Sequence, residues 1–419
     1  VEDIPGTALH EGLTWDWESF PDYLDALAKI PRTIDIAAMV PHDPLRVYVR
    51  GDRAVHSEPA NDADTAEMRR LTREALEAGA VGFATGRSDV HKTADGEWTP
   101  SSESTREELT GIAKAFDGLD YGVVQAVSDF NLERGEQDFD EEWAIIADYA
   151  KASGRPFSFS LMQRDFAPDQ WLKLIERTEK LKDEGVDARM QVAPRAIGVF
   201  LGFNCTFHPF MGYPSYKTIA DLPLAERVAR MKDPAFKAQI LSEKTDKLSG
   251  PGSSVPPLAD LLMEHIELVA EKFFQLGNPP DYEQSGENSL AARARDKGVS
   301  LMEMIYDTLL ERDGHAMLYF PLFNYYTGNL DIVHEMLTHP HAVFGLGDGG
   351  AHCGALCDSS FPTTLIQHWG RDRTRGPKLP LEQLISMQTK ETAELVGIYD
   401  RGLLKPGYKA DVNVIDFDN

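Results

Sequence analysis

The residues best suited to chemistry follow an apolar run near the end of the chain, in the segment AVFGLGDGGAHCGALC. The run predicts a buried strand, and Asp348 and His352 come after it, four residues apart and separated by glycines. Parallel α/β proteins keep their catalytic groups at the carboxyl ends of strands. Glycines lack a Cβ and so let a ligand approach the backbone closely. Asp348 and His352 are therefore the candidate catalytic pair, and the alternative is that each only caps a turn or a helix.

The elements that would position this pair alternate between helices and short apolar runs. Residues 62–79 combine an N-cap candidate, a helical period and a closing glycine, and they lead directly into the run 80–87. The full set of predicted strands is 34–40, 80–87, 121–130, 155–163, 187–195, 315–325 and 342–350. Strands that alternate with helices predict parallel βα units. Seven of them favour a (β/α)8 TIM-like barrel that lacks about one strand, and no GxGxxG opens a helix to favour a dinucleotide fold.

Composition excludes several classes of partner. The 419 residues include 42 Lys and Arg and 68 Asp and Glu, which gives a formal net charge of −26. Such a surface repels phosphate backbones and anionic membranes, so we expect neither nucleic acid nor membrane as a partner. Three cysteines are too few for a disulfide framework and fit a reducing compartment. We therefore expect a cytoplasmic protein that acts on a small molecule, and we leave open whether it forms a homo-oligomer.

Two regions interrupt the alternation of helices and strands. About a hundred residues without a strong strand follow the run 187–195, and we interpret residues 202–300 as an insertion over the active-site end. Within it, the PFMGYPSY portion of residues 202–257 is expected to form a lid over the barrel mouth. Residues 399–419 end in VNVIDF, which alternates like a strand. We thus divide the chain into a barrel, residues 1–398, and a terminal strand region, residues 399–419.

Three segments carry a family resemblance. GLGDGGAH, the helical LEQLISMQTKETAELVGI and the closing DRGLLKPGYKADVNVID resemble the last section of the amidohydrolase superfamily. The opening VEDIPGTALHEGLTWDWESFPDYLDALA is similar to its N-acyl-D-amino-acid deacylase (D-aminoacylase) branch, and the similarity runs along nearly the whole chain. The resemblance implies a metal-dependent hydrolase, with zinc the expected metal, that releases a carboxylate and a free amino acid from an N-acyl-D-amino acid. It also implies that residues 399–419 are the return strand of a small β-sandwich.

The resemblance also assigns roles, and the chain departs from it in two ways. It implies that Asp348 is both general base and metal ligand, whereas three roles stay open for His352: it could bind metal, hydrogen-bond the oxyanion or cap a turn. The His-x-His pair and the early metal-binding Cys of the branch do not occur, so we expect that an amino-terminal segment with the first strand is missing. The strands expected to end in His offer other side chains, namely Gln125, Ser128, Asp129, Ser160 and Gln163. A binuclear site is therefore not expected; a mononuclear site with further ligands in the missing segment and a metal-free barrel both stay open.

Recognition of an N-acyl amino acid requires a cation for its free carboxylate, and Arg pairs with carboxylate in a planar fork. Arg87 and Arg195 end predicted strands, whereas Arg371 and Arg373 follow the last strand and fit a solvated loop equally well. Asn324 and Tyr325 end another predicted strand and could shape the pocket or pack against it. Two histidines are further pocket candidates, His42 after the first strand and His208 in the expected lid.

Three functions fit this sequence. The first is hydrolysis of an N-acyl-D-amino acid. The second is hydrolysis of another C–N bond, such as a cyclic amide or a carbamoyl group, because those substrates use the same metal and Asp. The third is a degenerate barrel that binds a small molecule without catalysis. If the barrel reading is right, one group of side chains faces a common mouth: Arg87, Gln125, Gln163, Arg195, Asn324 and Asp348.

Overall fold

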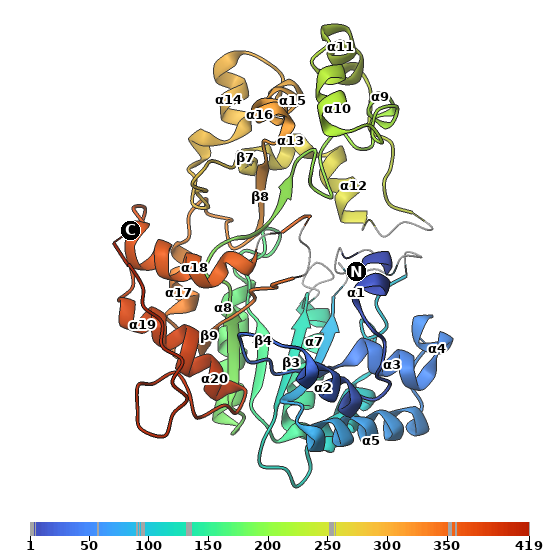
Figure 1. Cartoon of the computed structure of the whole chain (residues 1–419), viewed down its shortest axis with the longest axis vertical. Coiled ribbons are helices and arrows are strands. Elements are labelled where there is room, and N and C mark those ends of the chain that lie inside the picture. The colour runs from blue at the N-terminus through green and yellow to red at the C-terminus, as the bar shows by residue number, and fades with distance from the viewer. Residues whose placement is uncertain are drawn as a thin grey trace.

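The computed structural model describes residues 4, 6–56, 58–88, 91, 93, 97–130, 136–250, 255, 257–350, 354–356 and 358–418. It shows two lobes, one built around a parallel sheet and one around a small antiparallel sheet (Figure 1). We call the first the barrel lobe and the second, residues 197–323, the cap. The strands of the parallel sheet point their carboxyl ends toward the cap (Figure 1).

The barrel lobe holds a six-stranded sheet in which every neighbouring pair is parallel. Its order is β1 (Met39–Pro41), β2 (Gly82–Arg87), β3 (Val123–Ser128), β4 (Phe157–Ser160), β5 (Ala188–Val192) and β9 (Ala342–Phe344). The predicted parallel α/β sheet is therefore confirmed, with six of the seven predicted strands in it. Hydrogen bonds between described residues do not join β1 to β9, so they do not close the sheet into a ring.

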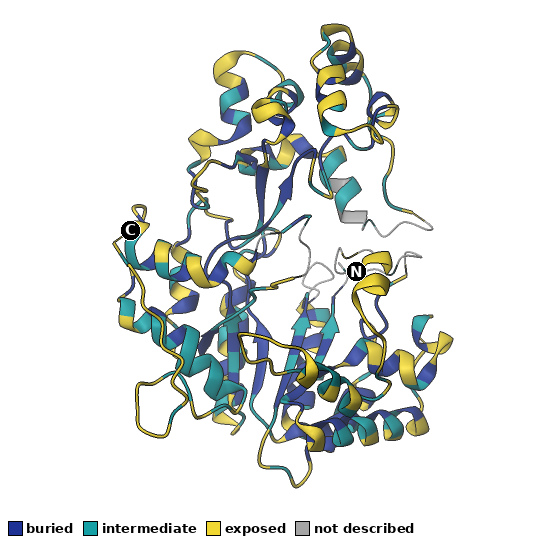
Figure 2. Ribbon diagram, in the orientation of Figure 1, coloured by how far each residue is buried: buried dark blue, intermediate teal, exposed yellow. Residues whose placement is uncertain are grey.

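Helices cover the sheet, and their ends follow local sequence rules. The helix predicted at 62–79 is α5 (Asp62–Ala78), which begins at a capping box between Asn61 and Asp64 and ends at Gly79, whose φ is +120°. The other α-helices of this lobe are α1 (Gly6–Gly12), α2 (Phe20–Lys29), α3 (His42–Arg50), α4 (Asp52–Val55), α6 (Arg106–Ala113), α7 (Glu136–Ser153), α8 (Gln170–Asp183), α17 (Asp331–Leu337), α18 (Phe361–Thr364), α19 (Leu381–Ser386) and α20 (Thr392–Leu395). Two π-helical stretches, Leu365–Asp372 and Met387–Glu391, continue α18 and α19. The strands are the most buried part of the lobe (Figure 2).

The cap corrects the prediction for residues 315–325. That run forms β8 (Leu318–Phe323), which lies between β6 (Ile197–Leu201) and β7 (Phe274–Gln275) in an antiparallel sheet and not in the parallel one. A short apolar run looks the same in either kind of buried sheet, and nothing in the sequence identified β6 as its partner. The cap helices are α9 (Pro214–Lys217), α10 (Leu224–Met231), α11 (Pro234–Ser242), α12 (Pro257–Glu264), α13 (Ile266–Val269), α14 (Leu290–Lys297), α15 (Leu301–Leu309) and α16 (Glu311–Gly314).

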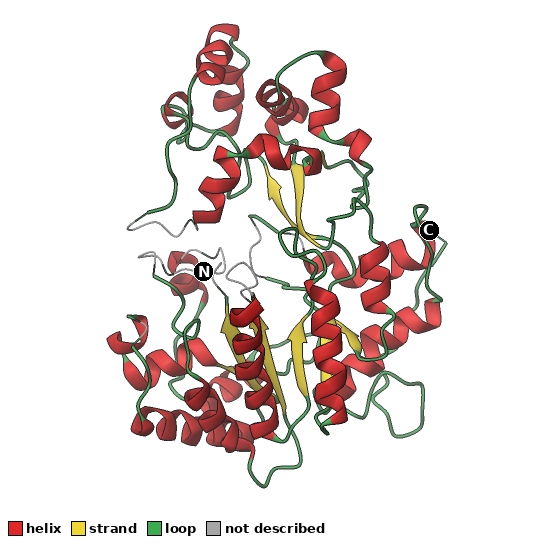
Figure 3. Ribbon diagram, turned by 180° about the vertical axis from the view of Figure 1, so that it is seen from behind, coloured by secondary structure: helices red, strands yellow, loops and turns green. Residues whose placement is uncertain are grey.

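The cap has a hydrophobic core of its own, separate from that of the barrel lobe. Phe210 and Tyr216, which belong to the PFMGYPSY segment predicted to be the lid, are buried in this core, and Phe210 packs edge-on against Tyr306. The cap as a whole stands on the side of the strands' carboxyl ends (Figures 1 and 3). The aromatic side chains of that segment, however, stabilise the cap and do not face the parallel sheet.

The chain end does not form the predicted strand. Residues 409–416 have no regular structure, and the side chains of Val412 and Val414 are 64% and 97% exposed. A strand needs a hydrogen-bonding partner, and the described chain offers none at this place. The tail is instead fastened near its start, where Arg401 pairs with Asp35 at 2.7 Å and Lys409 with the same carboxylate. Among the described residues, none of the helices has the length and apolar character needed to cross a membrane.

His208 makes the stability of the cap depend on pH. Its ring lies 4.4 Å from the Tyr216 ring and its Nδ1 accepts a hydrogen bond from the Phe210 amide at 3.2 Å. Burial, together with the charge of Arg227, lowers the pKa of His208 from 6.5 to about 3. The pKa of His208 is therefore lower in the folded protein than in the unfolded chain. The stability that the neutral His208 gives the cap is present above pH 6.5 and is lost as pH falls toward 3. At about 1.4 kcal/mol per pKa unit, the loss amounts to several kcal/mol.

We predict that His208→Asn makes the stability of the cap less dependent on pH in this window. The Asn side chain can still accept the Phe210 amide but cannot be protonated. Hydrogen–deuterium exchange of the cap amides at pH 7 and pH 4 measures the effect, with the exposed His10→Asn as control. An equal loss of protection in the wild type and in His208→Asn would contradict the assignment.

Candidate active site

The candidate site is the face formed by the carboxyl ends of the parallel strands, below the cap. Seven non-glycine residues of the described chain have positive φ, and four of them follow strands there: Phe130, Asn324, Leu346 and Asp348. Such conformations cost about 1–3 kcal/mol each and gather at functional sites. The backbone strain therefore marks the same face that the sequence predicts.

Asp348 lies four residues beyond the end of β9, with a φ of +36° and its side chain exposed. The amide of Gly345 donates to the carbonyl of Val192 at 3.2 Å, which keeps the start of this turn beside the end of β5. The turn thus presents a carboxylate at the strand ends, as predicted. His352 falls outside the described residues, so its pairing with Asp348 stays a prediction.

Arg87, predicted to meet a substrate carboxylate, is held by the protein's own carboxylate. Its Nε and one terminal nitrogen donate to the two oxygens of Glu142 on α7, at 2.8 and 2.9 Å. Ser128 donates to the same carboxylate at 2.8 Å. The side chain of Arg87 is 9% exposed, so its guanidinium points into the helix layer and not into the mouth.

Arg195 follows β5 and is fully buried between two aromatic rings. Its guanidinium carbon lies 4.0 Å from the centre of the Tyr282 ring, which belongs to the cap, and 4.6 Å from that of Phe361. Its terminal nitrogens donate to Ser360 Oγ at 3.2 Å and to the Ala196 carbonyl at 3.0 Å, and Asp358 lies 3.4 Å away. Arg195 therefore packs the cap against the barrel lobe in this arrangement.

Arg373 is the centre of a third buried ion pair. It donates from Nε and from a terminal nitrogen to Glu283 of the cap, at 3.1 and 3.0 Å, and it contacts Asp331 at 2.7 Å. His368 Nε2 lies 3.0 Å from the same Glu283 carboxylate. Hydrogen bonds from His368 and Arg373 outweigh burial and lower the pKa of Glu283 to about 2. Arg371, by contrast, is on the surface beside Asp372.

Asn324 and Gln163 meet although they come from different sheets. Asn324 follows β8, and its Oδ1 accepts a hydrogen bond from the backbone N–H of Gln163 at 2.8 Å. The backbone N–H of Asn324 donates to the backbone carbonyl of Gln163 at 3.0 Å. Asn324 is fully buried, and its Nδ2 has no hydrogen-bond partner among the described residues. Tyr325 is buried with its hydroxyl donating to the Gln284 carbonyl at 2.6 Å, and Gln125 lies in the middle of β3 rather than at its end.

His42, a further pocket candidate, belongs to a closed polar network. Its Nδ1 lies 2.9 Å from Thr85 Oγ1 and its Nε2 3.0 Å from Glu108, which also pairs with Arg46 at 2.7 Å. The side chains of His42 and Glu108 are completely buried, and burial lowers the pKa of His42. The network joins α3 and β2 to α6, and both ring nitrogens of His42 are already used within the protein.

Asp129 is a carboxylate at the mouth to which the sequence analysis gave no role. It directly follows β3, its side chain is 25% exposed, and it accepts a hydrogen bond from Ser88 Oγ at 3.0 Å. Arg164, after β4, lies 3.9 Å from it. Its place at the end of an alternating run was the signal in the sequence, whereas the family resemblance leads one to expect His at that position.

The described residues do not by themselves form a metal centre. No group of three or more His, Cys, Asp and Glu side chains with the spacing of a metal site occurs in the described part of the chain. Asp348 offers oxygen ligands, whereas the ends of β3 and β4 offer mostly hydroxyls and amides.

Comparison with known proteins decides the family. The sequence profile described as "Amidohydrolase family" matches residues 6–419. The chain belongs to the amidohydrolase family. Members of this family are hydrolases with a TIM-like barrel, and they generally bind divalent metals. The open parallel sheet is the part of that barrel which the described residues form.

Three relatives show how far the similarity reaches. A D-aminoacylase from Alcaligenes xylosoxydans xylosoxydans is 34% identical over 110 residues, or 26% of this chain and 20% of the relative. An N-acyl-D-aspartate deacylase from the same organism is 34% identical over 100 residues, or 24% and 18%. An uncharacterised protein from Mycobacterium bovis is 23% identical over 437 residues, which cover 99% of this chain and 67% of the relative. The aligned part thus spans about a fifth of the length of the two deacylases.

We predict that Glu283→Gln destabilises the protein by about 3–5 kcal/mol, because it leaves the buried Arg373 facing a neutral amide. Chemical denaturation measures the change, and Glu287→Gln, on an exposed residue of the same segment, is the control. The stability that Glu283 contributes is present above pH 4.5 and is lost as pH falls toward 2, so the two proteins should converge in acid. A change below about 0.5 kcal/mol would show that the cluster does not fasten the cap.

Proposed function

We propose that the protein hydrolyses the amide bond of an N-acyl-D-amino acid, a small-molecule substrate, with Asp348 as the proton acceptor. The observation that carries the proposal is the exposed carboxylate on a strained turn at the end of β9. The names of the two partial relatives, a D-aminoacylase and an N-acyl-D-aspartate deacylase, support the substrate class. The divalent metal, expected to be zinc, takes Asp348 as one ligand, with His352 as a second candidate.

In the proposed reaction, Asp348 transfers one proton from water to the leaving nitrogen. The carboxylate accepts a proton from water as the water oxygen bonds to the amide carbon, and it returns that proton to the nitrogen as the C–N bond breaks. A carboxylate and a free amino acid leave. Such general base and acid action contributes typically about 10²- to 10⁴-fold.

The side chains proposed to contact the substrate differ in whether they already form hydrogen bonds or ion pairs within the protein. Asn324 keeps a donor without a partner among the described residues, which makes its Nδ2 the first choice for a substrate oxygen. Tyr325 follows it directly in the chain, whereas Arg87, Arg195, Arg371 and Arg373 would first have to release protein carboxylates. Hydrolysis of a cyclic amide or a carbamoyl group uses the same groups, so a substrate panel separates these reactions.

A barrel that binds without catalysis is the second candidate. The hydroxyls and amides at the ends of β3 and β4, where the sequence comparison expected His, favour it. Metal content and turnover distinguish it from the hydrolase.

Asp348→Asn is predicted to lower turnover of an N-acetyl-D-amino acid by at least 10²-fold, about 3 kcal/mol of barrier, while the protein stays folded. Asn tolerates positive φ about as well as Asp, so the turn keeps its shape. Turnover and bound metal are measured for the wild type, for Asp348→Asn and for the exposed Asp183→Asn as control. Near-normal activity in Asp348→Asn would remove the base assignment.

A further inference from the structure

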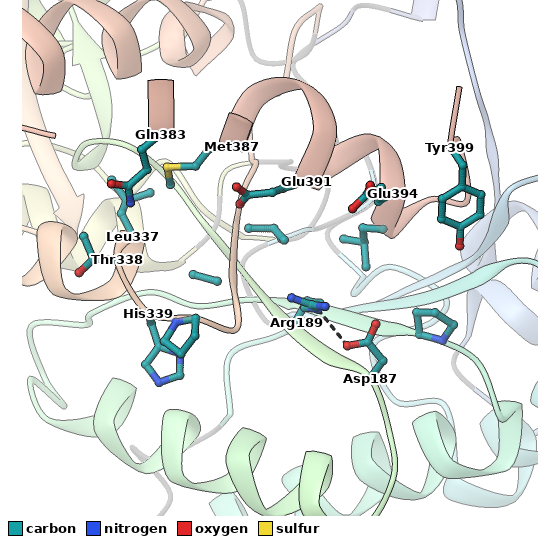
Figure 4. Close-up of a pocket in the computed structure, with 15 residues that line it drawn as sticks. Asp187, Arg189, Leu337, Thr338, His339, Gln383, Met387, Glu391, Glu394 and Tyr399 are labelled. Carbon is teal, nitrogen blue, oxygen red and sulfur yellow. Dashed lines mark hydrogen bonds and ion pairs between the residues drawn. The ribbon is translucent and has the colours of Figure 1, made fainter. Parts of the chain in front are cut away.

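A cavity of 480 Å³ lies at the opposite end of the parallel sheet from the candidate active site (Figure 4). Its walls include Pro156 just before β4, Asp187 and Arg189 at the start of β5, and Ala342 and Val343 at the start of β9. The segment from α19 to Tyr399 forms the facing wall. The volume falls in the range of about 300–1,000 Å³ that small-molecule sites occupy.

One wall of this cavity carries a guanidinium with unused donors. Arg189 donates from Nε to Asp187 at 2.9 Å, and within the described chain its two terminal nitrogens make no hydrogen bond. Its side chain is 34% exposed. A fork of terminal N–H groups with an open approach matches a carboxylate in a bidentate pair.

The facing wall carries two carboxylates. Figure 4 shows Glu391 and Glu394 extending from the helical segment toward the strand that carries Arg189. Glu391 accepts a hydrogen bond from Ser386 at 2.8 Å, and Lys390 stays 3.5 Å from Glu394, so both retain acceptor positions. Met387 and Leu395 supply apolar surface between the charged groups.

We propose that this cavity binds a free α-amino acid as a zwitterion, at a site distinct from the candidate active site. Arg189 receives the ligand carboxylate, Glu391 and Glu394 receive its ammonium group, and an aliphatic side chain packs on Met387 and Leu395. Charges of opposite sign on opposite walls select a molecule that carries both. The inference does not depend on the proposed hydrolysis, because it concerns binding alone.

Calorimetric titration of the 419-residue chain with leucine tests the proposal. The L-enantiomers are used, because the proposed substrate of the active site is an N-acyl-D-amino acid. N-acetyl-L-leucine lacks the ammonium group and L-leucinamide lacks the carboxylate, so each should bind at least tenfold more weakly than L-leucine, since each loses a charge-assisted contact. This comparison needs no variant. Equal binding of the three compounds, or no binding of leucine, would overturn the proposal.

Two variants locate the site. Arg189→Gln should weaken leucine binding at least tenfold, and Arg177→Gln, which removes a similarly exposed arginine paired with Asp140, should not change it. Glu394→Gln, which removes one acceptor for the ammonium group, should also weaken leucine binding. Its matched control is Glu74→Gln on α5, because the Glu74 side chain is 41% exposed and that of Glu394 is 42% exposed. Leucine binding that survives Arg189→Gln but is lost in Asp348→Asn would place the amino acid at the candidate active site and refute this second site, without touching the case for hydrolysis.

Discussion

Buried pairs of arginine and carboxylate hold the carboxyl ends of the strands in place. Arg46 with Glu108, Arg87 with Glu142 and Arg373 with Glu283 each join a strand end, or the helix beside one, to a different element. Removing charges from water is expensive, and the attraction between partners repays it only with good geometry and full hydrogen bonding. These pairs are therefore weak as a net source of stability, but each one strongly disfavours any arrangement that separates its partners.

This constraint limits what the arginines can do for a ligand. A guanidinium that already forms a bidentate pair in a low-dielectric site would have to leave its carboxylate uncompensated in order to bind another. We therefore assign recognition in the proposed site to groups whose hydrogen-bonding capacity is unused among the described residues, such as the Nδ2 of Asn324. The cap contributes to the same end of the sheet, because Tyr282 and Glu283 reach Arg195 and Arg373 across the junction.

The sequence predicted what depends on near neighbours and missed what depends on distant ones. The capping box of α5, six parallel strands and the position of Asp348 after β9 all follow from patterns a few residues long. The partner of His42 is 66 residues away, that of Arg87 is 55 and that of Arg373 is 90, and no local pattern reveals such pairs. For this reason three buried structural side chains looked like ligand-binding residues.

The placement of β8 shows a second limit. Its residues are apolar enough for any buried strand, and only the presence of β6 assigns them to the cap. The end of β8 nevertheless returns to the parallel sheet, where Asn324 bonds to Gln163 with both its backbone and its side chain. Asn324 was predicted to lie at the end of a strand of the parallel sheet. It reaches that end of the sheet from β8 of the cap, which the sequence analysis had assigned to the barrel.

The candidate active site and the cavity at the opposite end of the sheet both adjoin β5 and β9. Binding at one site could therefore affect binding at the other through these two strands. Arg189 begins β5 and Arg195 follows it, six residues or about 20 Å further along an extended chain. Both strands are hydrogen-bonded to each other and packed in one core, so they move as a unit. A ligand at the amino ends can alter the mouth only if it binds two arrangements of that unit with different affinity. The buried ion pairs at the carboxyl ends resist such a second arrangement, so the physical expectation is two sites that bind independently.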